Sequence, residues 1–329
     1  AFLTMAIGAC IALISQTYQI QGNLSGFLLT WMLLAIPLVY LLDSTTTAVL
    51  FLAGLCGWAG ATQANQHSAL LLWPLLALTL PHGYLLYRRE SANRHETFFE
   101  TALAVTLLIC LAIALEHALP GVWAPAYATL LALLYLAGRT FFAGQRFHPF
   151  LPIGAAGIVM LSFILTFSSP CEALFRGPHR HNAIPPDWSP WYDGANLLAL
   201  TAVAGILLAK RLRARDFYSL LWCIPALLGL CAFAWGNFGG APLPGTARIL
   251  FNLYLLVLGV LVLWRGIHND NLATANGGLA ILALLFIGRF FDAELNLALR
   301  GVLFIILGVG FLTANILFIR KRKSEGTPA

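Results

Sequence analysis

Three arginines and one aspartate in the C-terminal third of the sequence are the residues best suited to bind a charged ligand. Arg289 and Asp292 lie three positions apart at the end of an apolar segment, so on a continuous helix they share one face and can form an ion pair. Arg300 follows across a short turn, and Arg248 begins another apolar segment. Forked guanidinium groups bind phosphates and carboxylates through paired hydrogen bonds. The cluster therefore predicts either a site for an anionic lipid headgroup or a structural ion pair that fixes a hairpin.

A second group of polar residues lies near the N-terminus and is uncharged. Residues 15–23 read Ser-Gln-Thr-Tyr-Gln-Ile-Gln-Gly-Asn, which includes Gln16, Tyr18 and Gln21. Amide and hydroxyl groups both donate and accept hydrogen bonds, so they suit a hydroxyl-rich ligand such as a sugar headgroup. The alternative interpretation is an ordinary solvated loop, and the sequence leaves both open.

No motif predicts a catalytic or metal centre. His179 and His181 lie two apart in a long connection, but a metal site needs further ligands, and none accompanies them in the sequence. The sequence has no Gly-rich phosphate loop, no serine nucleophile elbow and no CxxC spacing, which are the signatures of common catalytic and metal sites. We therefore expect no metal and no cofactor, and an enzyme is the least favoured class of function.

The composition places these residues in a membrane protein. Hydrophobic residues make up 60% of the 329 residues and charged residues 10%, whereas soluble domains carry about 25% charged residues. The apolar residues form blocks of about 17 to 20, which is the length that a helix needs to cross the hydrocarbon layer. The net charge of +6 comes from short basic clusters between these blocks, where orientation signals occur. Nucleic acid is therefore not an expected partner, and the sequence predicts an all-α, polytopic transmembrane helical bundle.

Twelve apolar blocks predict about twelve transmembrane helices. They span residues 1–15, 25–42, 46–61, 68–87, 98–115, 123–142, 151–167, 194–210, 216–235, 247–264, 272–290 and 299–319. Most connections are short, so sequential helices should be antiparallel neighbours. The one long connection, 168–193, predicts a non-cytoplasmic loop between a first half of about seven helices, 1–167, and a second half of about five, 194–320, with a tail at 321–329.

The distribution of lysine and arginine predicts the orientation. When the basic tail at 320–323 is placed in the cytoplasm and the blocks alternate, fourteen of the 19 Lys and Arg residues fall on the cytoplasmic side. The other five are Arg176, Arg180, Arg248, Arg289 and Arg300. Because cytoplasmic loops carry an excess of basic residues, we expect both ends of the chain to face the cytoplasm of a bacterium, across its inner membrane. No carboxylate falls in the middle of an apolar block, which argues against a transporter coupled to ions by a midplane acid.

Two regions of the sequence resemble a known family. Residues 8–22 read Gly-Ala-Cys-Ile-Ala-Leu-Ile-Ser-Gln-Thr-Tyr-Gln-Ile-Gln-Gly and are followed by Leu-Thr-Trp at 29–31. Together with the C-terminal segments 263–267, 288–292 and 300–304, they resemble an uncharacterised family of bacterial membrane proteins, the domain of unknown function 2157. The resemblance implies a membrane fold but no activity. Family members usually carry a further pair of helices before this segment, and that pair is not part of this sequence, which begins at Ala1 inside an apolar run.

Two classes of function stay open. The first is a carrier or binder of an amphipathic, lipid-linked or envelope-glycan substrate that enters from the non-cytoplasmic face, with membrane lipids, including an anionic one, as partners. The residues expected to bind it are Gln16, Tyr18, Gln21, Arg248, Arg289, Asp292 and Arg300. The second is a non-transporting scaffold or assembly partner, and an enzyme acting on lipid-linked sugars is a distant third. A polar cavity that joins the first loop to Arg289 favours the first class, and a filled bundle favours the second.

The orientation predicts which thiols a membrane-impermeant reagent reaches from outside. Cys171 is the one cysteine in a hydrophilic connection and should be labelled, whereas a cysteine introduced by Ser324→Cys should be protected until the membrane is opened. Labelling of Ser324→Cys in intact cells is the result that would contradict the predicted topology.

Overall fold

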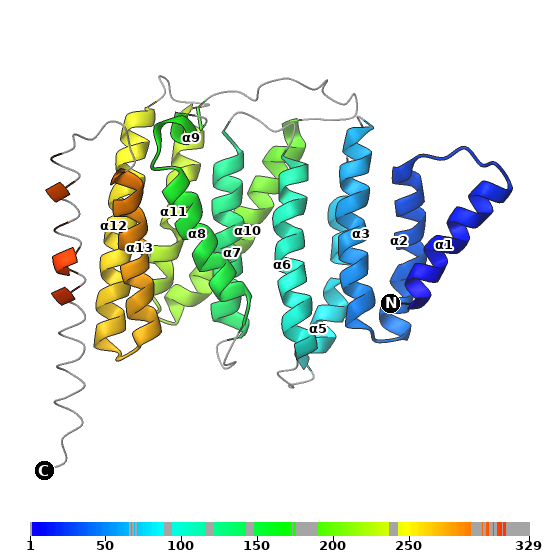
Figure 1. Ribbon diagram of the computed structural model, residues 1–329, viewed down its shortest axis with the longest axis horizontal. Coiled ribbons are helices and arrows are strands. Elements are labelled where there is room, and N and C mark those ends of the chain that lie inside the picture. The colour runs from blue at the N-terminus through cyan, green and yellow to red at the C-terminus, as the bar shows by residue number, and fades with distance from the viewer. Residues whose placement is uncertain are drawn as a thin grey trace, which may run out of the picture. The chain divides into compact units, whose positions relative to one another are not determined.

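The computed structural model describes residues 2–65, 67, 69, 71–88, 94–115, 121–142, 148–172, 174–175, 190–236, 243–290, 298, 301–302, 305, 308–310 and 312–313. Within these residues, the chain forms thirteen α-helices (Figure 1). They are α1 (Phe2–Thr17), α2 (Leu24–Leu41), α3 (Thr45–Ala64), α4 (Leu72–Ala77), α5 (Leu80–Arg88), α6 (Arg94–Ala114), α7 (Trp123–Phe141), α8 (Phe150–Ile164), α9 (Ser168–Glu172), α10 (Pro190–Arg213), α11 (Tyr218–Ala234), α12 (Pro244–His268) and α13 (Leu272–Phe290).

The helices belong to two compact units. Unit 1 comprises residues 1–158 and 174–240, and unit 2 comprises residues 159–173 and 241–329. Unit 1 therefore contains α1 to α7, the first part of α8, α10 and α11, while unit 2 contains the rest of α8 with α9, α12 and α13. The boundary falls inside α8, so each unit is built from segments that are distant in the sequence.

Six helices in the described part of the chain are long and apolar enough to cross a membrane. These spans are Leu24–Leu41, Thr45–Ala64, Glu96–Ala114, Trp191–Arg213, Pro244–His268 and Leu272–Phe290. Three shorter apolar helices, α1, α8 and α11, accompany them. The predicted all-α, multi-span membrane class is confirmed, but the described helices do not amount to twelve clear spans.

Proline explains why the apolar block 68–87 is not one helix. Helix α4 ends at Ala77 and α5 begins at Leu80, with Pro81 in the first turn of α5, where a missing N–H costs no helical hydrogen bond. The hydroxyl of Thr79 donates to the Leu76 carbonyl at 2.8 Å, which satisfies an acceptor at the end of α4. The last expected span, 299–319, lies largely outside the described residues.

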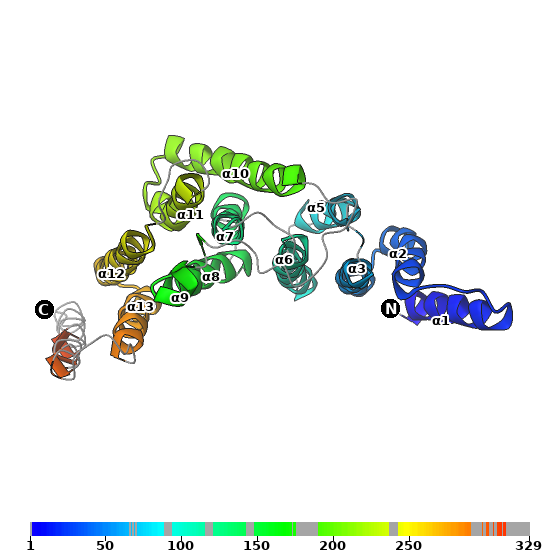
Figure 2. The same ribbon diagram turned by 90° about the horizontal axis from the view of Figure 1, so that it is seen from above.

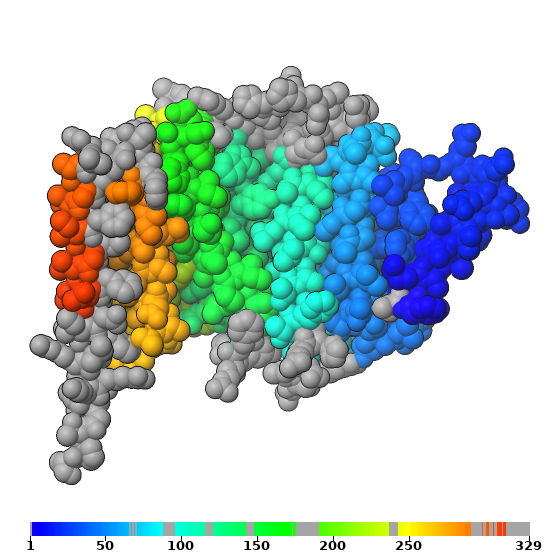
Figure 3. Space-filling view, viewed as in Figure 1, coloured from blue at the N-terminus to red at the C-terminus, as the bar shows by residue number. Residues whose placement is uncertain are grey.

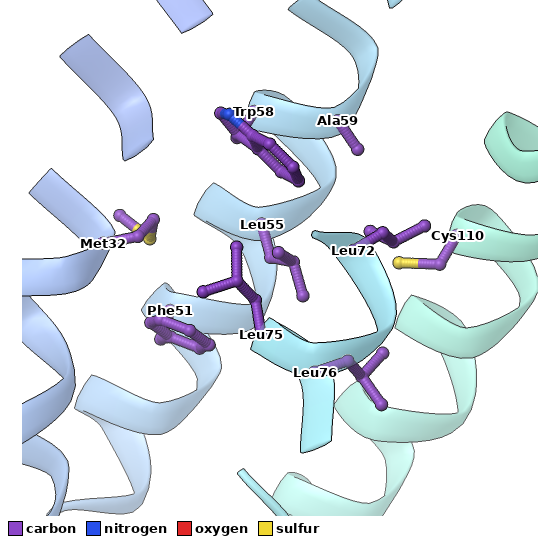
Figure 4. Close-up of a cluster of buried hydrophobic side chains, with 9 residues drawn as sticks. All are labelled: Met32, Phe51, Leu55, Trp58, Ala59, Leu72, Leu75, Leu76 and Cys110. Atoms are coloured by element: carbon purple, nitrogen blue, oxygen red, sulfur yellow. The ribbon is translucent and has the colours of Figure 1, made fainter. Parts of the chain in front are cut away.

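The short helix α4 still contributes to the core of unit 1. Its Leu72, Leu75 and Leu76 lie between α3 and α6 (Figure 4). The full cluster consists of Met32, Phe51, Leu55, Trp58, Ala59, Leu72, Leu75, Leu76 and Cys110. Side chains of α3 and α6 also pack against each other on the face seen in Figure 3. Helix α4 is too short to cross a membrane, and it fills space beside α3 and α6, which are long enough to do so.

Helix α7 of unit 1 packs against α6, α10 and α11 (Figure 2). Most residues between Ala124 and Gly138 are buried, and Tyr135 stacks on Trp222 of α11 with ring centroids 4.9 Å apart. Because other helices cover α7, it needs less apolar surface than a helix that faces lipid. This position explains why α7 is long enough to span but is not among the six helices that are also apolar enough.

Basic side chains gather at one end of unit 1, which we call the basic end. Figure 1 places the C-terminal ends of α5, α7 and α10 there, opposite the α1–α2 connection. Arg139 of α7 forms an ion pair with Asp216 at 2.9 Å, and Arg211 of α10 donates to the Thr140 hydroxyl at 3.2 Å. The count of basic residues on the two sides of the membrane requires these helix ends to lie on the same side, and their grouping agrees with that requirement. The side of the membrane that the basic end faces stays a prediction.

In unit 2, α12 and α13 form a tightly packed hairpin. A Cβ atom added at Gly266 would lie 2.3 Å from the Ala275 nitrogen, and one added at Gly278 would lie 2.3 Å from the Leu263 nitrogen. Small residues allow helix backbones to approach closely in membranes. The Asn271 side chain caps α13 by accepting a hydrogen bond from the Thr274 nitrogen at 3.1 Å. The two glycines and the cap together fix the hairpin.

We predict that Gly278→Ala destabilises the hairpin, because the new methyl group meets the α12 backbone, which cannot rotate away as a side chain could. The expected loss is about 1–3 kcal/mol, typical of overpacking. The neighbouring Gly277 has nothing within 4 Å of an added Cβ, so Gly277→Ala should be neutral or stabilising by about 0.5–1 kcal/mol. Thermal unfolding of the two purified variants makes the comparison, and equal midpoints would show that α12 and α13 are not in close contact.

Candidate functional site

The polar residues expected near the N-terminus lie on the surface of unit 1. Gln16 is in the last turn of α1, and Tyr18 and Gln21 are in the connection to α2; all three are exposed. Neighbouring polar groups hold the connection in shape: the Ser15 hydroxyl donates to the Ile20 carbonyl at 3.2 Å. The structure therefore presents these residues to the surroundings, and their role as ligand contacts stays a prediction.

Only part of the expected arginine cluster falls within the described residues. Asp292 and Arg300 lie outside them, so the predicted ion pair between Arg289 and Asp292 stays a prediction. Arg289 is in the last turn of α13, where its guanidinium donates to the Thr166 carbonyl and lies 5.2 Å from the Phe167 ring centroid. Thr166 follows the end of α8, where carbonyls lack helical partners and attract cations. This arrangement favours the structural interpretation of Arg289.

Arg248 lies near the same segment of unit 2. Helix α12, which carries Arg248, contacts α9, and the thiol of Cys171 in α9 donates to the Pro244 carbonyl at 3.3 Å. Cys171 is fully buried, and this burial raises its pKa to about 11, although the charge of Arg248 opposes the effect. The expectation that Cys171 is open to thiol reagents is therefore wrong, because labelling requires an accessible thiolate.

A pocket of about 360 Å³ lies at the basic end of unit 1. Its lining comes from α5, α6, α7, the residue after α7 and the first residue of α8, and it is mostly apolar. The lining residues are Leu80, Gly83, Tyr84, Leu86, Tyr87, Glu96, Phe99, Glu100, Leu103, Ala137, Phe141, Phe142 and Phe150. The pocket combines aromatic rings with two carboxylates, and none of its members was among the residues expected from the sequence to bind a ligand.

Helical spacing brings the two carboxylates into the pocket. Glu96 and Glu100 are four apart in α6, and Phe99 and Leu103 continue the same stripe, because residues three and four apart share a helix face. Each of the two glutamates is only 6% exposed. Glu96 lies in the first turn of α6, where the helix dipole stabilises a negative charge.

His148 fixes the position of Glu100. The Nε2 atom of His148 lies 2.9 Å from Oε2 of Glu100, and the backbone nitrogen of Phe150 donates to Nδ1 of the same ring at 3.3 Å. Phe142 stacks on the imidazole with centroids 3.5 Å apart. His148, which accepts from the Phe150 nitrogen, therefore lies beside Glu100.

Two further charged groups at the basic end are paired with each other outside the pocket lining. Burial raises the pKa of Asp216, but hydrogen bonds from Ser219 and Arg139, with the charges of Arg139 and Arg211, outweigh burial and hold the pKa below its ordinary value. The ionised carboxylate is therefore the form that this contact stabilises, and the stabilisation is lost as the pH falls through the lowered pKa. Arg139 is engaged by this partner and does not line the pocket.

The contacts of Arg289 predict that Arg289→Ala lowers the thermal stability of the purified protein, because the Thr166 carbonyl loses its donor and Phe167 its cation. Arg289→Lys keeps the positive charge but lacks the forked guanidinium group, so it should lose less thermal stability. If Arg289 instead serves an anionic lipid, wild-type stability should rise with added phosphatidylglycerol and the rise should vanish in Arg289→Ala. Unchanged midpoints for both variants, with and without the lipid, would rule out both roles.

Comparison with known proteins gives one match. No curated protein and no solved structure shows a significant match to the chain. A family model described as a predicted membrane protein (DUF2157) matches residues 1–48. The matched part contains α1, α2 and the start of α3, with Gln16, Tyr18 and Gln21, whereas the pocket and the arginines lie beyond it. The resemblance seen in residues 8–22 and 29–31 is thus confirmed: this multi-span membrane protein carries, at residues 1–48, a match to the family DUF2157.

Proposed function

We propose that this membrane protein binds an amphipathic molecule and that the pocket between α5, α6 and α7 is the binding site. The observation that carries the proposal is the pocket itself, with a volume of about 360 Å³ and an apolar lining that includes two buried carboxylates. Ligand sites in proteins are concave, mostly apolar and supplied with a few convergent polar groups, and their volumes start near ~300 Å³. The pocket has each of these properties.

The position of the pocket in unit 1 suits a molecule with an apolar and a polar part. Leu80, Leu86 and Leu103 offer apolar contacts, while Glu96 and Glu100 offer acceptors in the first turns of α6. An amphipathic molecule rests at the membrane interface with its polar group toward water and its apolar part in the hydrocarbon layer. The end of a helix bundle, where apolar spans meet polar connections, is therefore where such a ligand would dock.

This proposal keeps the amphipathic ligand expected from the sequence and changes its place of entry. The sequence favoured the non-cytoplasmic face, whereas the pocket lies at the basic end of unit 1, which the positive-inside rule assigns to the cytoplasm. A second candidate, an anionic headgroup in unit 2, is supported by the position of Arg248 and Arg289 around α9. A scaffold role is the alternative, but the exposed apolar side chains of α12, such as Ile249 and Leu253, are also what a lipid-facing helix presents.

Filling the pocket should abolish ligand binding. Ala137 lines the pocket, so Ala137→Phe places a ring where the ligand would lie, while Ala202→Phe makes the same change at an exposed position of α10 and serves as the matched control. Proteins in nanodiscs are heated with decyl amphiphiles that carry cationic, anionic, zwitterionic or sugar headgroups. A ligand present at a hundred times its Kd stabilises by about 2.7 kcal/mol.

We expect at least one amphiphile to raise the unfolding temperature of the wild type and of Ala202→Phe, and to leave Ala137→Phe unchanged. An equal rise in all three proteins would place binding elsewhere. No rise in any protein with any headgroup would overturn the proposal.

A further inference from the structure

We propose that the C-terminal end of α10 binds the headgroup of an anionic membrane lipid through Lys210, Arg213 and Arg215. We call these three residues the α10 cluster. They do not line the pocket between α5, α6 and α7, so this proposal concerns a second ligand and goes beyond the proposed function. Its support comes from the charge of the segment, the position of the cluster along α10, and the backbone conformation of Arg215.

The segment from 210 to 216 has a net positive charge. It reads Lys-Arg-Leu-Arg-Ala-Arg-Asp, with four basic residues and one acidic residue. The acidic residue, Asp216, already accepts hydrogen bonds from Arg139 and Ser219, each at 2.9 Å. The side chains of the α10 cluster are all exposed. Because neighbouring like charges repel each other, a bound anion lowers the electrostatic energy of the cluster.

Contacts with α7 hold the end of α10 in place. The Nζ atom of Lys210 lies 5.6 Å from the centroid of the Phe141 ring, which is within the range of a cation–π contact. Arg211 donates from Nε to the Thr140 hydroxyl at 3.2 Å. Arg211 therefore contributes to packing between the helices, and the α10 cluster is left at the surface. Cations that the fold holds in place bind an anion with a smaller loss of entropy than flexible ones.

The length of α10 places the cluster at the level of lipid headgroups. Trp191 and Tyr192 are exposed in the first turn of α10, and such aromatic side chains are enriched at the membrane interface. Trp191 and Lys210 are nineteen residues apart, which is about 28 Å along a helix. This length is close to the hydrocarbon thickness of about 30 Å. When Trp191 lies at one interface, Lys210 therefore lies at the other.

Apolar side chains beside the cluster favour a lipid over a soluble anion. Helix α10 lies on the outside of unit 1, next to α7 and α11 (Figure 2). Ile206, one turn before Lys210, and Phe217, after the cluster, are each 67% exposed. A soluble anion makes no use of these surfaces, whereas the acyl chains of a lipid cover them. Basic groups at the end of a spanning helix attract anionic headgroups, and guanidinium groups bind phosphate through forked hydrogen bonds.

The backbone of Arg215 supports a role for its side chain. Its φ is 59°, in the left-handed region that favours glycine. The Arg215 nitrogen donates to the Leu212 carbonyl at 2.9 Å, and the Asp216 nitrogen donates to the Arg211 carbonyl at 3.0 Å. This pair of bonds closes a helix end, usually with glycine at the position of Arg215. Residues held in unfavourable backbone conformations are concentrated at functional sites.

The test measures lipid binding by native mass spectrometry of the protein in an uncharged detergent. Phosphatidylglycerol, which is anionic, is compared with phosphatidylcholine, which has the same acyl chains and no net charge. We expect the wild type to bind phosphatidylglycerol at least tenfold more tightly. The triple change Lys210→Gln, Arg213→Gln and Arg215→Gln should remove this preference, because each basic residue near an anionic surface contributes about fivefold in affinity.

A single change and a charge-matched control show whether the position of the charge matters. Arg213→Gln should lose several-fold in affinity for phosphatidylglycerol. Arg265→Gln removes one basic residue from the last turn of α12 in unit 2 and should leave that affinity unchanged. Equal losses in the two variants would mean that the lipid responds to net charge alone, and the proposed site would be wrong.

Arg215→Gly separates lipid binding from stability. Glycine relieves the left-handed backbone, so the lipid-free variant should unfold at a higher temperature than the wild type, while its affinity for phosphatidylglycerol falls. Gln19→Gly makes the same change at another left-handed residue, with a φ of 52°, and should raise stability without changing lipid affinity. A less stable Arg215→Gly with unchanged lipid affinity would show that the Arg215 side chain is structural.

The remaining outcomes distinguish the ligand and the site. Equal affinity of the wild type for both lipids would overturn the proposal. If inorganic phosphate raises the unfolding temperature as much as phosphatidylglycerol does, the ligand is a soluble anion and the assignment to a lipid is wrong. Ala137→Phe, which fills the pocket, should keep the preference for phosphatidylglycerol. Loss of the preference in that variant would place the lipid in the pocket instead of at the α10 cluster.

Discussion

A charged side chain among apolar helices is stable only where a donor, an opposite charge or water faces it, and this requirement shapes the basic end of unit 1. Asp216 faces Arg139 and Ser219, and Glu100 faces His148. These contacts join α7 to the α10–α11 connection and α6 to the segment before α8. Apolar packing alone leaves helices free to slide or rotate, whereas each polar contact fixes one register. The pocket lies between α5, α6 and α7 at the end where these contacts occur.

The sequence was sufficient to predict the class of fold, because composition and block length limit what a chain can do in water and in lipid. It expected one long helix in blocks where the described helices are shorter: α5 begins at Leu80 within the block 68–87, and α8 ends at Ile164, before its block does. Hydropathy averages over such positions, whereas Pro81 lacks the N–H group that a helix continuing from α4 would need there.

The sequence did not predict the pocket, for a physical reason. Glu96 and Glu100 lie near the start of an apolar segment, where carboxylates are usually solvated, and their burial depends on Phe142, His148 and Phe150, which are distant in the sequence. The sequence contains a helical stripe that consists of Glu96, Phe99, Glu100 and Leu103. The spacing of these residues shows that they share a helix face, but it does not reveal what that face packs against. Arg289 shows the converse: its chemistry suited an anion, and the structure adds a contact with the Thr166 carbonyl, which is distant in the sequence. The family match over residues 1–48 does not reach either site.

The central proposal is that an amphipathic molecule occupies the pocket between α5, α6 and α7. The most direct measurement is a crystal structure of the protein in a lipid phase, soaked in turn with bromine-labelled decyl amphiphiles that carry cationic, anionic, zwitterionic or sugar headgroups, in which anomalous scattering locates the bromine. The account predicts, for at least one of these amphiphiles, a bromine peak among Leu80, Leu86 and Leu103. A pocket closed by its own side chains, or a bromine peak only outside the pocket, would contradict the account.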